Sequence, residues 1–137
     1  MTDAKLESLG AKRMIVNEQP GFPCRVSLMD APLGERVILT HFRHHDTNSP
    51  YRAAGPIFVR EEAQGAKPAV NEIPVMFAHR RLSVRAYDED AMMTNARVIE
   101  GNALKLTIRE FFAGNSVAYL HIHNAAPGCF NCRVERA

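Results

Sequence analysis

Short segments rich in β-branched and aromatic residues follow one another along the chain, separated by turns that contain proline and glycine. Within residues 81–87, Leu82, Val84 and Ala86 alternate with polar side chains, and this period of two is typical of a strand with one buried face. The same character predicts strands at residues 11–18, 35–44, 56–61, 81–87, 95–100, 116–123 and 128–135. So many strands with little helix between them favour an antiparallel arrangement.

One segment, residues 102–113, instead repeats its apolar residues at helical spacing. The stripe consists of Leu104, Ile108, Phe111 and Phe112. Asn102 is suited to cap the first turn, and Gly114 is suited to end the helix. We therefore expect a single α+β domain over residues 1–137, in which one main helix packs on an antiparallel sheet or half-barrel with a C-terminal β-hairpin. Disorder, if present, is expected in the polar residues 1–10.

Composition narrows the class of protein. Apolar residues make up 46% of the 137 residues and charged residues 23%, which is the balance of a globular chain. The N-terminus lacks the pattern of a secretory signal and the number of cysteines is odd, so reduced thiols and a cytoplasmic location are expected. The net charge is only +2, without a basic run, and no apolar run is long enough for a membrane helix. Neither nucleic acid nor a membrane is therefore an expected partner.

The last two predicted strands form a hairpin whose register can be tested by matching apolar residues. Placing His123 opposite Cys129 gives a wholly apolar core face. That face pairs Ile122 with Phe130, Leu120 with Cys132 and Ala118 with Val134. The opposite face carries the densest group in the sequence of side chains that can bind a ligand or take part in catalysis: Tyr119, His121, His123, Cys129, Asn131, Arg133 and Glu135.

Cys129 and Cys132 form a C-x-x-C sequence, a spacing found in redox and metal sites. Residues three apart in a strand point to opposite faces, so the two thiols are not expected to act together, and Cys132 is interpreted as a small core residue. The common nucleotide-binding, metalloprotease and serine-hydrolase motifs do not occur in the sequence.

One interpretation of the polar face is a metal site. His121, His123 and Cys129 are good ligands for zinc or iron, and an open fourth position would make such a site catalytic. Further ligands are available at Cys24, His44 and His45.

A second interpretation is nucleophilic catalysis. Cys129 would be the nucleophile and His123 its base, with His121 beside them and Asn131 orienting the imidazole. A nucleophilic thiol usually lies at a sharp turn or helix start that lowers its pKa, and the predicted strand offers neither.

A third interpretation is a pocket for a small anionic molecule, because arginine matches the geometry of carboxylates and phosphates. The candidate ligand-binding residues are Cys24, Arg25, Tyr51, Arg52, Asn131 and Arg133, with Arg60 as a further arginine. The remaining alternative is a solvated face or the interface of a homodimer, since antiparallel sheets commonly have one polar face.

Several short sequences in the chain also occur together in one known family. They are Gly21-Phe22-Pro23-Cys24-Arg25, Ser49-Pro50-Tyr51-Arg52 with Gly55-Pro56-Ile57-Phe58-Val59, Arg85-Ala86-Tyr87-Asp88, and His121-Ile122-His123-Asn124 with Pro127-Gly128-Cys129-Phe130. From about Gly21 onward the chain resembles the bacterial domain-of-unknown-function family numbered 1203. The resemblance implies a small single-domain bacterial protein and supplies neither a reaction nor catalytic residues.

These observations favour the binding or turnover of a small anionic ligand in a pocket of histidine, cysteine and arginine, with or without a metal. The alternative is a non-catalytic binding or homo-oligomerisation module. A concave site that gathers the candidate residues would favour the first function, and a flat exposed face would favour the second.

Overall fold

The structure is a computed structural model that describes residues 1–19 and 21–137. Its strands form two antiparallel sheets, a three-stranded sheet of order β1-β2-β3 and a four-stranded sheet of order β5-β4-β6-β7. The strands are β1 Lys12–Ile15, β2 Arg36–His45, β3 Ala53–Arg60, β4 Arg81–Tyr87, β5 Met93–Glu100, β6 Tyr119–Asn124 and β7 Phe130–Glu135. The helices are α1 Asp3–Ser8 and α2 Leu104–Phe112, with short 3-10 turns at η1 Val75–Phe77 and η2 Gly101–Ala103. The predicted α+β class is confirmed, and the sheets do not close into a barrel.

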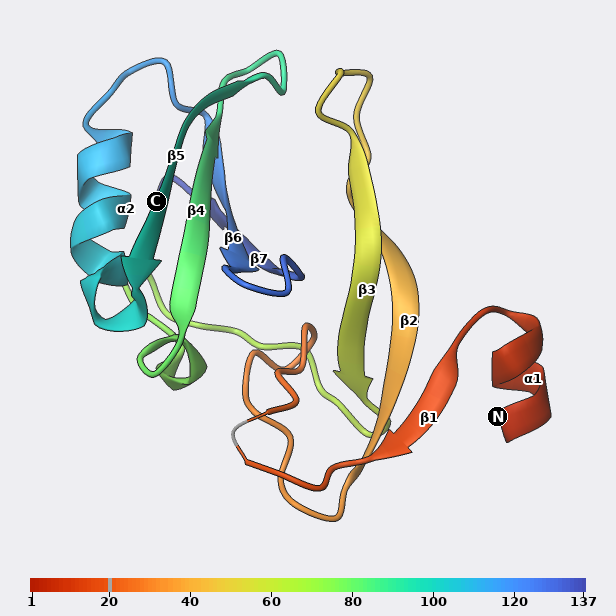
Figure 1. Cartoon of the computed structure of the whole chain (residues 1–137). Coiled ribbons are helices and arrows are strands. Elements are labelled where there is room, and N and C mark those ends of the chain that lie inside the picture. The colour runs from red at the N-terminus through yellow and green to blue at the C-terminus, as the bar shows by residue number, and fades with distance from the viewer. Residues whose placement is uncertain (20) are drawn as a thin grey trace.

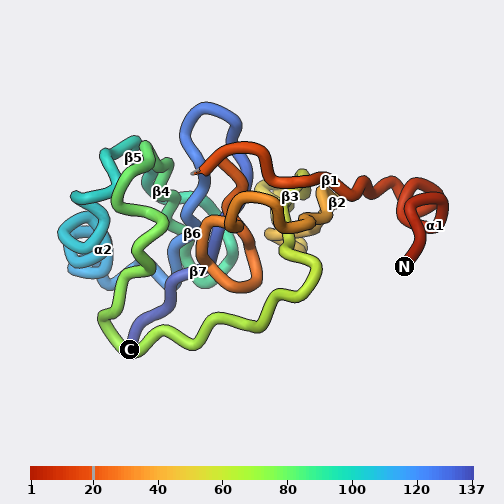
Figure 2. The backbone as a smooth tube through the Cα atoms, turned by 90° about the horizontal axis from the view of Figure 1, so that it is seen from below, coloured from red at the N-terminus to blue at the C-terminus, as the bar shows by residue number. Residues whose placement is uncertain are grey.

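The elements form three layers (Figure 1). Helix α2 covers one face of the four-stranded sheet, and β2 lies across the other face. The helical stripe packs as predicted, with Leu104 and Phe111 buried and Ile108 and Phe112 partly buried against the core. Asn102 is not the helix cap, because the chain enters α2 through η2 and no side chain caps its first turn. The connection between β3 and β4 passes close to the C-terminus (Figure 2).

The polar residues 1–10, where any disorder is expected from the sequence, contain helix α1. Thr2 caps this helix through its hydroxyl, which accepts a hydrogen bond from the Lys5 N–H at 3.2 Å. Neither this helix nor α2 has the length and hydrophobicity that a bilayer crossing requires in the part of the chain that is described.

The predicted register of the C-terminal hairpin is wrong. Strand β6 pairs Leu120 with Val134 and Ile122 with Cys132, two residues away from the predicted partners. A slide of two residues keeps every side chain on its face, so apolar matching alone could not distinguish the two registers.

A bulge then changes the face of one residue. Because Ile122 pairs with Cys132 and His123 pairs with Phe130, Asn131 is an extra residue in β7. Phe130 therefore lies beside the histidines rather than in the predicted core face, although it is still buried.

A second bulge lies at the end of β2. Phe42 pairs with Gly55 but His45 pairs with Ala53, so β2 contains one residue more than β3 over this stretch. The extra residue allows the neighbouring His44 and His45 both to contact His121 of the other sheet. Two bulges, one in each sheet, thus direct ring side chains into the space between the sheets.

Candidate functional site

The face that carries His121 and His123 is covered by β2 and is not exposed to solvent. Each of these side chains is only 1% exposed. The surrounding rings form what we call the histidine layer, which consists of Phe42, His44, His45, Tyr87, Tyr119, His121, His123 and Phe130. Within it, the ring centroid of His44 lies 5.0 Å from that of His123, and the centroid of His45 lies 5.0 Å from that of His121.

Burial keeps the imidazoles of His44, His121 and His123 uncharged at neutral pH. Burial, together with neighbouring histidines and arginines, lowers the pKa of His121 to about 3 and that of His123 to about 4, although the hydrogen bond to the Gly128 carbonyl acts in the opposite direction on His123. The pKa of His44 is lowered for the same reason, with contributions from His45, Arg85 and Arg25. At neutral pH these rings therefore offer one N–H donor and one lone pair each.

Two of the histidines are oriented by hydrogen bonds. His45 Nδ1 lies 2.8 Å from the carbonyl oxygen of Tyr51, and His45 Nε2 lies 2.6 Å from the hydroxyl of Tyr119. A carbonyl only accepts, so in the neutral ring Nδ1 donates to Tyr51 and the Tyr119 hydroxyl donates to Nε2. His123 Nδ1 lies 2.9 Å from the carbonyl oxygen of Gly128 and donates in the same way.

Three buried polar atoms in and beside the histidine layer have no hydrogen-bond partner among the described residues. They are Arg25 Nε, His121 Nδ1 and His123 Nε2. All three side chains surround the Phe130 ring, whose centroid lies 4.9 Å from Arg25 Cζ, 4.9 Å from the His121 ring and 5.5 Å from the His123 ring. Buried polar groups are nearly always hydrogen-bonded, so each of these three atoms needs a hydrogen-bond partner that the described residues do not provide.

Two of the three arginines beside the layer, Arg25 and Arg85, have no carboxylate partner among the described residues. Arg25 lies over the rings of Phe42 and Phe130, and burial lowers the pKa of its guanidinium. Arg85 donates from Nε to Ser83 Oγ at 3.2 Å. Within the described chain, neither arginine forms an ion pair with Asp or Glu. Arg133, which lies over the Tyr119 ring at 4.0 Å, pairs with the exposed Glu135.

The structure thus brings together part of the predicted site. His121, His123, Arg25 and Arg133 line or border the histidine layer, and Tyr51 joins it through its carbonyl group. Arg52 is exposed in the connection between β2 and β3, and Arg60 pairs with Glu35. The thiol of Cys24 is fully buried and accepts from the N–H groups of Ser27 and Arg60 at 3.4 and 3.3 Å.

The predicted strand pairing of Cys129 with His123 is not formed. Cys129 precedes β7 and does not pair with His123, and burial raises the pKa of its thiol. Asn131 donates to Asn124 Oδ1 at 2.8 Å, so it does not orient His123. A raised thiol pKa is the opposite of what a nucleophile needs.

The predicted zinc or iron site is likewise not formed by the predicted residues. Across residues 1–19 and 21–137, no group of three or more His, Cys, Asp or Glu side chains is placed to hold a metal ion. The four imidazoles instead contact one another edge to face and through Phe130.

Several site residues were missed by reading the sequence. Arg85 and Tyr87 lie on β4 directly opposite His121 and Tyr119 of β6. Their alternation with Leu82, Val84 and Ala86 correctly separated them from the core face, and this was the available signal. No local signal places His44 and His45 beside them, because that contact joins two different sheets.

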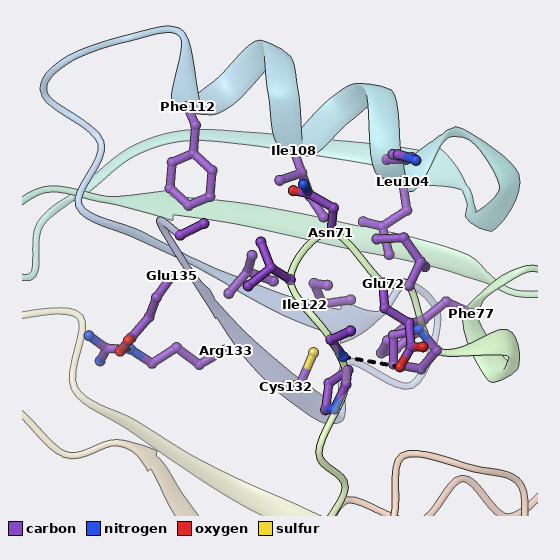
Figure 3. Close-up of a pocket in the computed structure, with 18 of the residues that line it drawn as sticks. Asn71, Glu72, Phe77, Leu104, Ile108, Phe112, Ile122, Cys132, Arg133 and Glu135 are labelled. Carbon is purple, nitrogen blue, oxygen red and sulfur yellow. Dashed lines mark hydrogen bonds and ion pairs between the residues drawn. The ribbon is translucent and has the colours of Figure 1, made fainter.

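An apolar pocket lies on the other side of the four-stranded sheet, between α2, β7 and residues 68–74 (Figure 3). Its volume is about 430 Å³. Leu104, Ile108 and Phe112 form one wall, and Ile122 and Cys132 lie opposite. The pocket is separated from the histidine layer by the sheet, since His121 and His123 lie on the opposite face from Ile122.

The three free thiols are expected to differ in reactivity. Cys24 is fully buried. Cys129 and Cys132 are both partly exposed, but burial raises the pKa of the Cys132 thiol to about 12. A thiol reagent should therefore modify one thiol per native chain rapidly, and Cys129→Ser should abolish that phase. Cys132→Ser is the matched control and should keep it. Rapid modification that survives in Cys129→Ser would contradict this assignment.

The fold and the site define a small three-layer α+β protein that holds a buried layer of histidines, bordered by arginines, between two antiparallel sheets. Residues 21–136 match the family described as "Protein of unknown function (DUF1203)", and the chain belongs to that family. No curated protein and no solved structure matches the chain.

Proposed function

We propose that this protein binds a small oxyanion, a carboxylate or phosphate, in the histidine layer, with Arg25 and Arg85 as its charged partners. The observation that carries the proposal is the pair of arginines beside a buried layer that has no ion-paired carboxylate for either of them. Removing a charge from water is costly unless an opposite charge or hydrogen bonds replace the water. A bound anion would provide both.

The neutral imidazoles suit this role. His121 and His123 each have one ring nitrogen available to a ligand and add no charge, while the arginines supply the attraction. The proposed role is binding, because the thiol considered as a nucleophile lies in the turn and has a raised pKa. A dimer built on this face would require the two sheets of one chain to separate, since His121 and His123 are already covered.

Replacing Arg25 with glutamine should weaken anion binding by about tenfold or more, because charge-assisted hydrogen bonds contribute about 1.5–3 kcal/mol. The measurement is isothermal titration calorimetry at neutral pH with phosphate, sulfate, acetate and glycolate as probes. Arg97→Gln is a matched control, since Arg97 also lies over a phenylalanine ring, Phe111, but on the other side of the molecule from Arg25 and paired with Glu110.

The native protein should bind at least one of these probes at a single saturable site. Arg97→Gln should retain that affinity. If no probe binds the native protein, or if Arg25→Gln binds as well as Arg97→Gln does, the proposed function is wrong.

A further inference from the structure

The hydrogen bond of His123 determines which of its nitrogens carries a proton. Nδ1 lies 2.9 Å from the carbonyl oxygen of Gly128, and that oxygen can only accept. The turn holds this carbonyl in place, because the Gly128 N–H donates to the Asn124 carbonyl oxygen at 2.9 Å and Gly128 has a φ of +80°, which favours glycine. Nδ1 is therefore the protonated nitrogen.

The other ring nitrogen of His123, Nε2, consequently carries a lone pair and can only accept a hydrogen bond. Burial keeps the pKa of the ring at about 4, so Nε2 carries no proton at neutral pH. Nε2 is buried and has no partner within the described chain. A buried acceptor of this kind needs a hydrogen-bond donor, and an anionic oxygen placed there would meet a lone pair instead.

The side chains around Nε2 do not supply that donor. The ring centroid of His123 lies 5.0 Å from that of His44 and 5.5 Å from that of Phe130, and no hydrogen bond joins either ring to His123. Arg25, on the same Phe130 ring, has the opposite requirement, since its buried Nε lacks an acceptor. A ligand that satisfies both residues must therefore carry an oxygen that accepts from Arg25 Nε and a group that donates to His123 Nε2.

We infer that the ligand carries a protonated oxygen beside its anionic oxygens, as a hydroxy acid or a protonated phosphate does, and that His123 Nε2 accepts a hydrogen bond from that O–H group. This inference rests on the proposed anion-binding function. It names the class of ligand, and it predicts discrimination against oxyanions that have no proton to donate.

Phosphate and sulfate separate these classes. Near pH 8 both are tetrahedral dianions of similar size, but phosphate retains one O–H group and sulfate has none. The native protein should bind phosphate at least about tenfold more tightly than sulfate, because a site built to hydrogen-bond a hydroxyl rejects analogues that lack it. Glycolate and acetate form a second pair, because glycolate carries an O–H group beside its carboxylate and acetate does not. Glycolate should therefore bind more tightly than acetate.

His123→Leu removes the acceptor and should bring each pair to within about threefold of equal affinity, because nothing then distinguishes the O–H group. Arg25→Gln should weaken both members of a pair and keep their ratio. His41→Leu, at an exposed position of β2, is the control and should change neither the affinities nor their ratio within a pair. Circular dichroism establishes that each variant folds.

A readout without substitution is the ¹⁵N resonance of His123 Nε2 in the native protein. Saturating phosphate should shift it from the value of a free lone pair to that of a hydrogen-bonded one, and sulfate should leave it unchanged. Equal affinity for phosphate and sulfate, or an unchanged resonance with phosphate bound, would overturn the inference while leaving anion binding intact. Failure of all four anions to bind would overturn the proposed function itself.

Discussion

Lowering the pH from about 7 to about 4 is expected to lower the free energy of unfolding of this protein by on the order of 5 kcal/mol. The cause is the burial of His121 and His123, which holds their pKa values at about 3 and about 4 in the folded protein. In the unfolded chain both imidazoles return to the ordinary pKa of about 6.5. Between these values the unfolded chain binds protons that the folded protein does not, so stability is fully present above about pH 6.5 and is lost as the pH falls through the folded pKa values.

Urea unfolding across this pH range measures the effect. The buffers should be cationic amines, because an anion bound in the histidine layer would favour protonated imidazoles and mask the loss. His121→Gln should remove about half of the pH dependence, since one of the two buried imidazoles no longer titrates. His41→Gln, at an exposed position, should leave the slope as in the native protein. An NMR titration in which His121 and His123 protonate near pH 6.5 would show that the layer is not dry.

Replacing Gly101 with alanine is expected to destabilise the protein by at least about 3 kcal/mol, among the largest effects of a single substitution. A Cβ atom at this position would lie 1.6 Å from the carbonyl oxygen of Phe77 and 2.8 Å from that of Arg80. Both neighbours are backbone atoms, and the Gly101 N–H already donates to the Arg80 carbonyl oxygen at 2.7 Å. The chain therefore cannot relieve the overlap by turning a side chain.

The position of Gly101 makes the consequence larger. It begins η2, which leads from β5 directly into α2, so a shift of this backbone displaces the helix that covers the four-stranded sheet. Gly55→Ala on β3 is a matched control, because a Cβ there would meet nothing within 4 Å. Chemical denaturation should place the Gly55 variant within about 0.5 kcal/mol of the native protein. A Gly101 variant of equal stability would mean that η1 and η2 do not approach as closely as described.

The proposed anion and the acid sensitivity have one physical origin. The layer is buried, and among the described residues no carboxylate forms an ion pair with Arg25 or Arg85 beside it, so it disfavours additional positive charge and favours negative charge. Binding an anion should therefore raise the pKa values of the buried histidines and stabilise the protein most at low pH.

Local patterns in the sequence determined the elements and the faces of most strands. The alternation in β4 separated Leu82, Val84 and Ala86, which are buried in the core, from Arg85, which borders the histidine layer, and Tyr87, which belongs to it. The helical stripe in α2 predicted its packing, because a period of 3.6 residues needs no knowledge of the partner surface. The same reasoning placed His121 and His123 on one face, opposite Ile122.

Only the tertiary structure decided the register of the hairpin, the two bulges and what covers the histidines. A slide of two residues preserves alternation, so the sequence could not select the pairing of Ile122 with Cys132. A bulge interrupts the alternation of a strand, and the contacts that stabilise it are made with another element. Here those contacts include the stacking of the His44 and Phe130 rings, whose centroids lie 5.0 Å apart. Whether a polar face meets solvent or a second sheet depends on contacts between segments far apart in the chain. For that reason the sequence determined that His121 and His123 share one face, and only the fold determined that both are buried and neutral, each with one ring nitrogen that lacks a hydrogen-bond partner among the described residues.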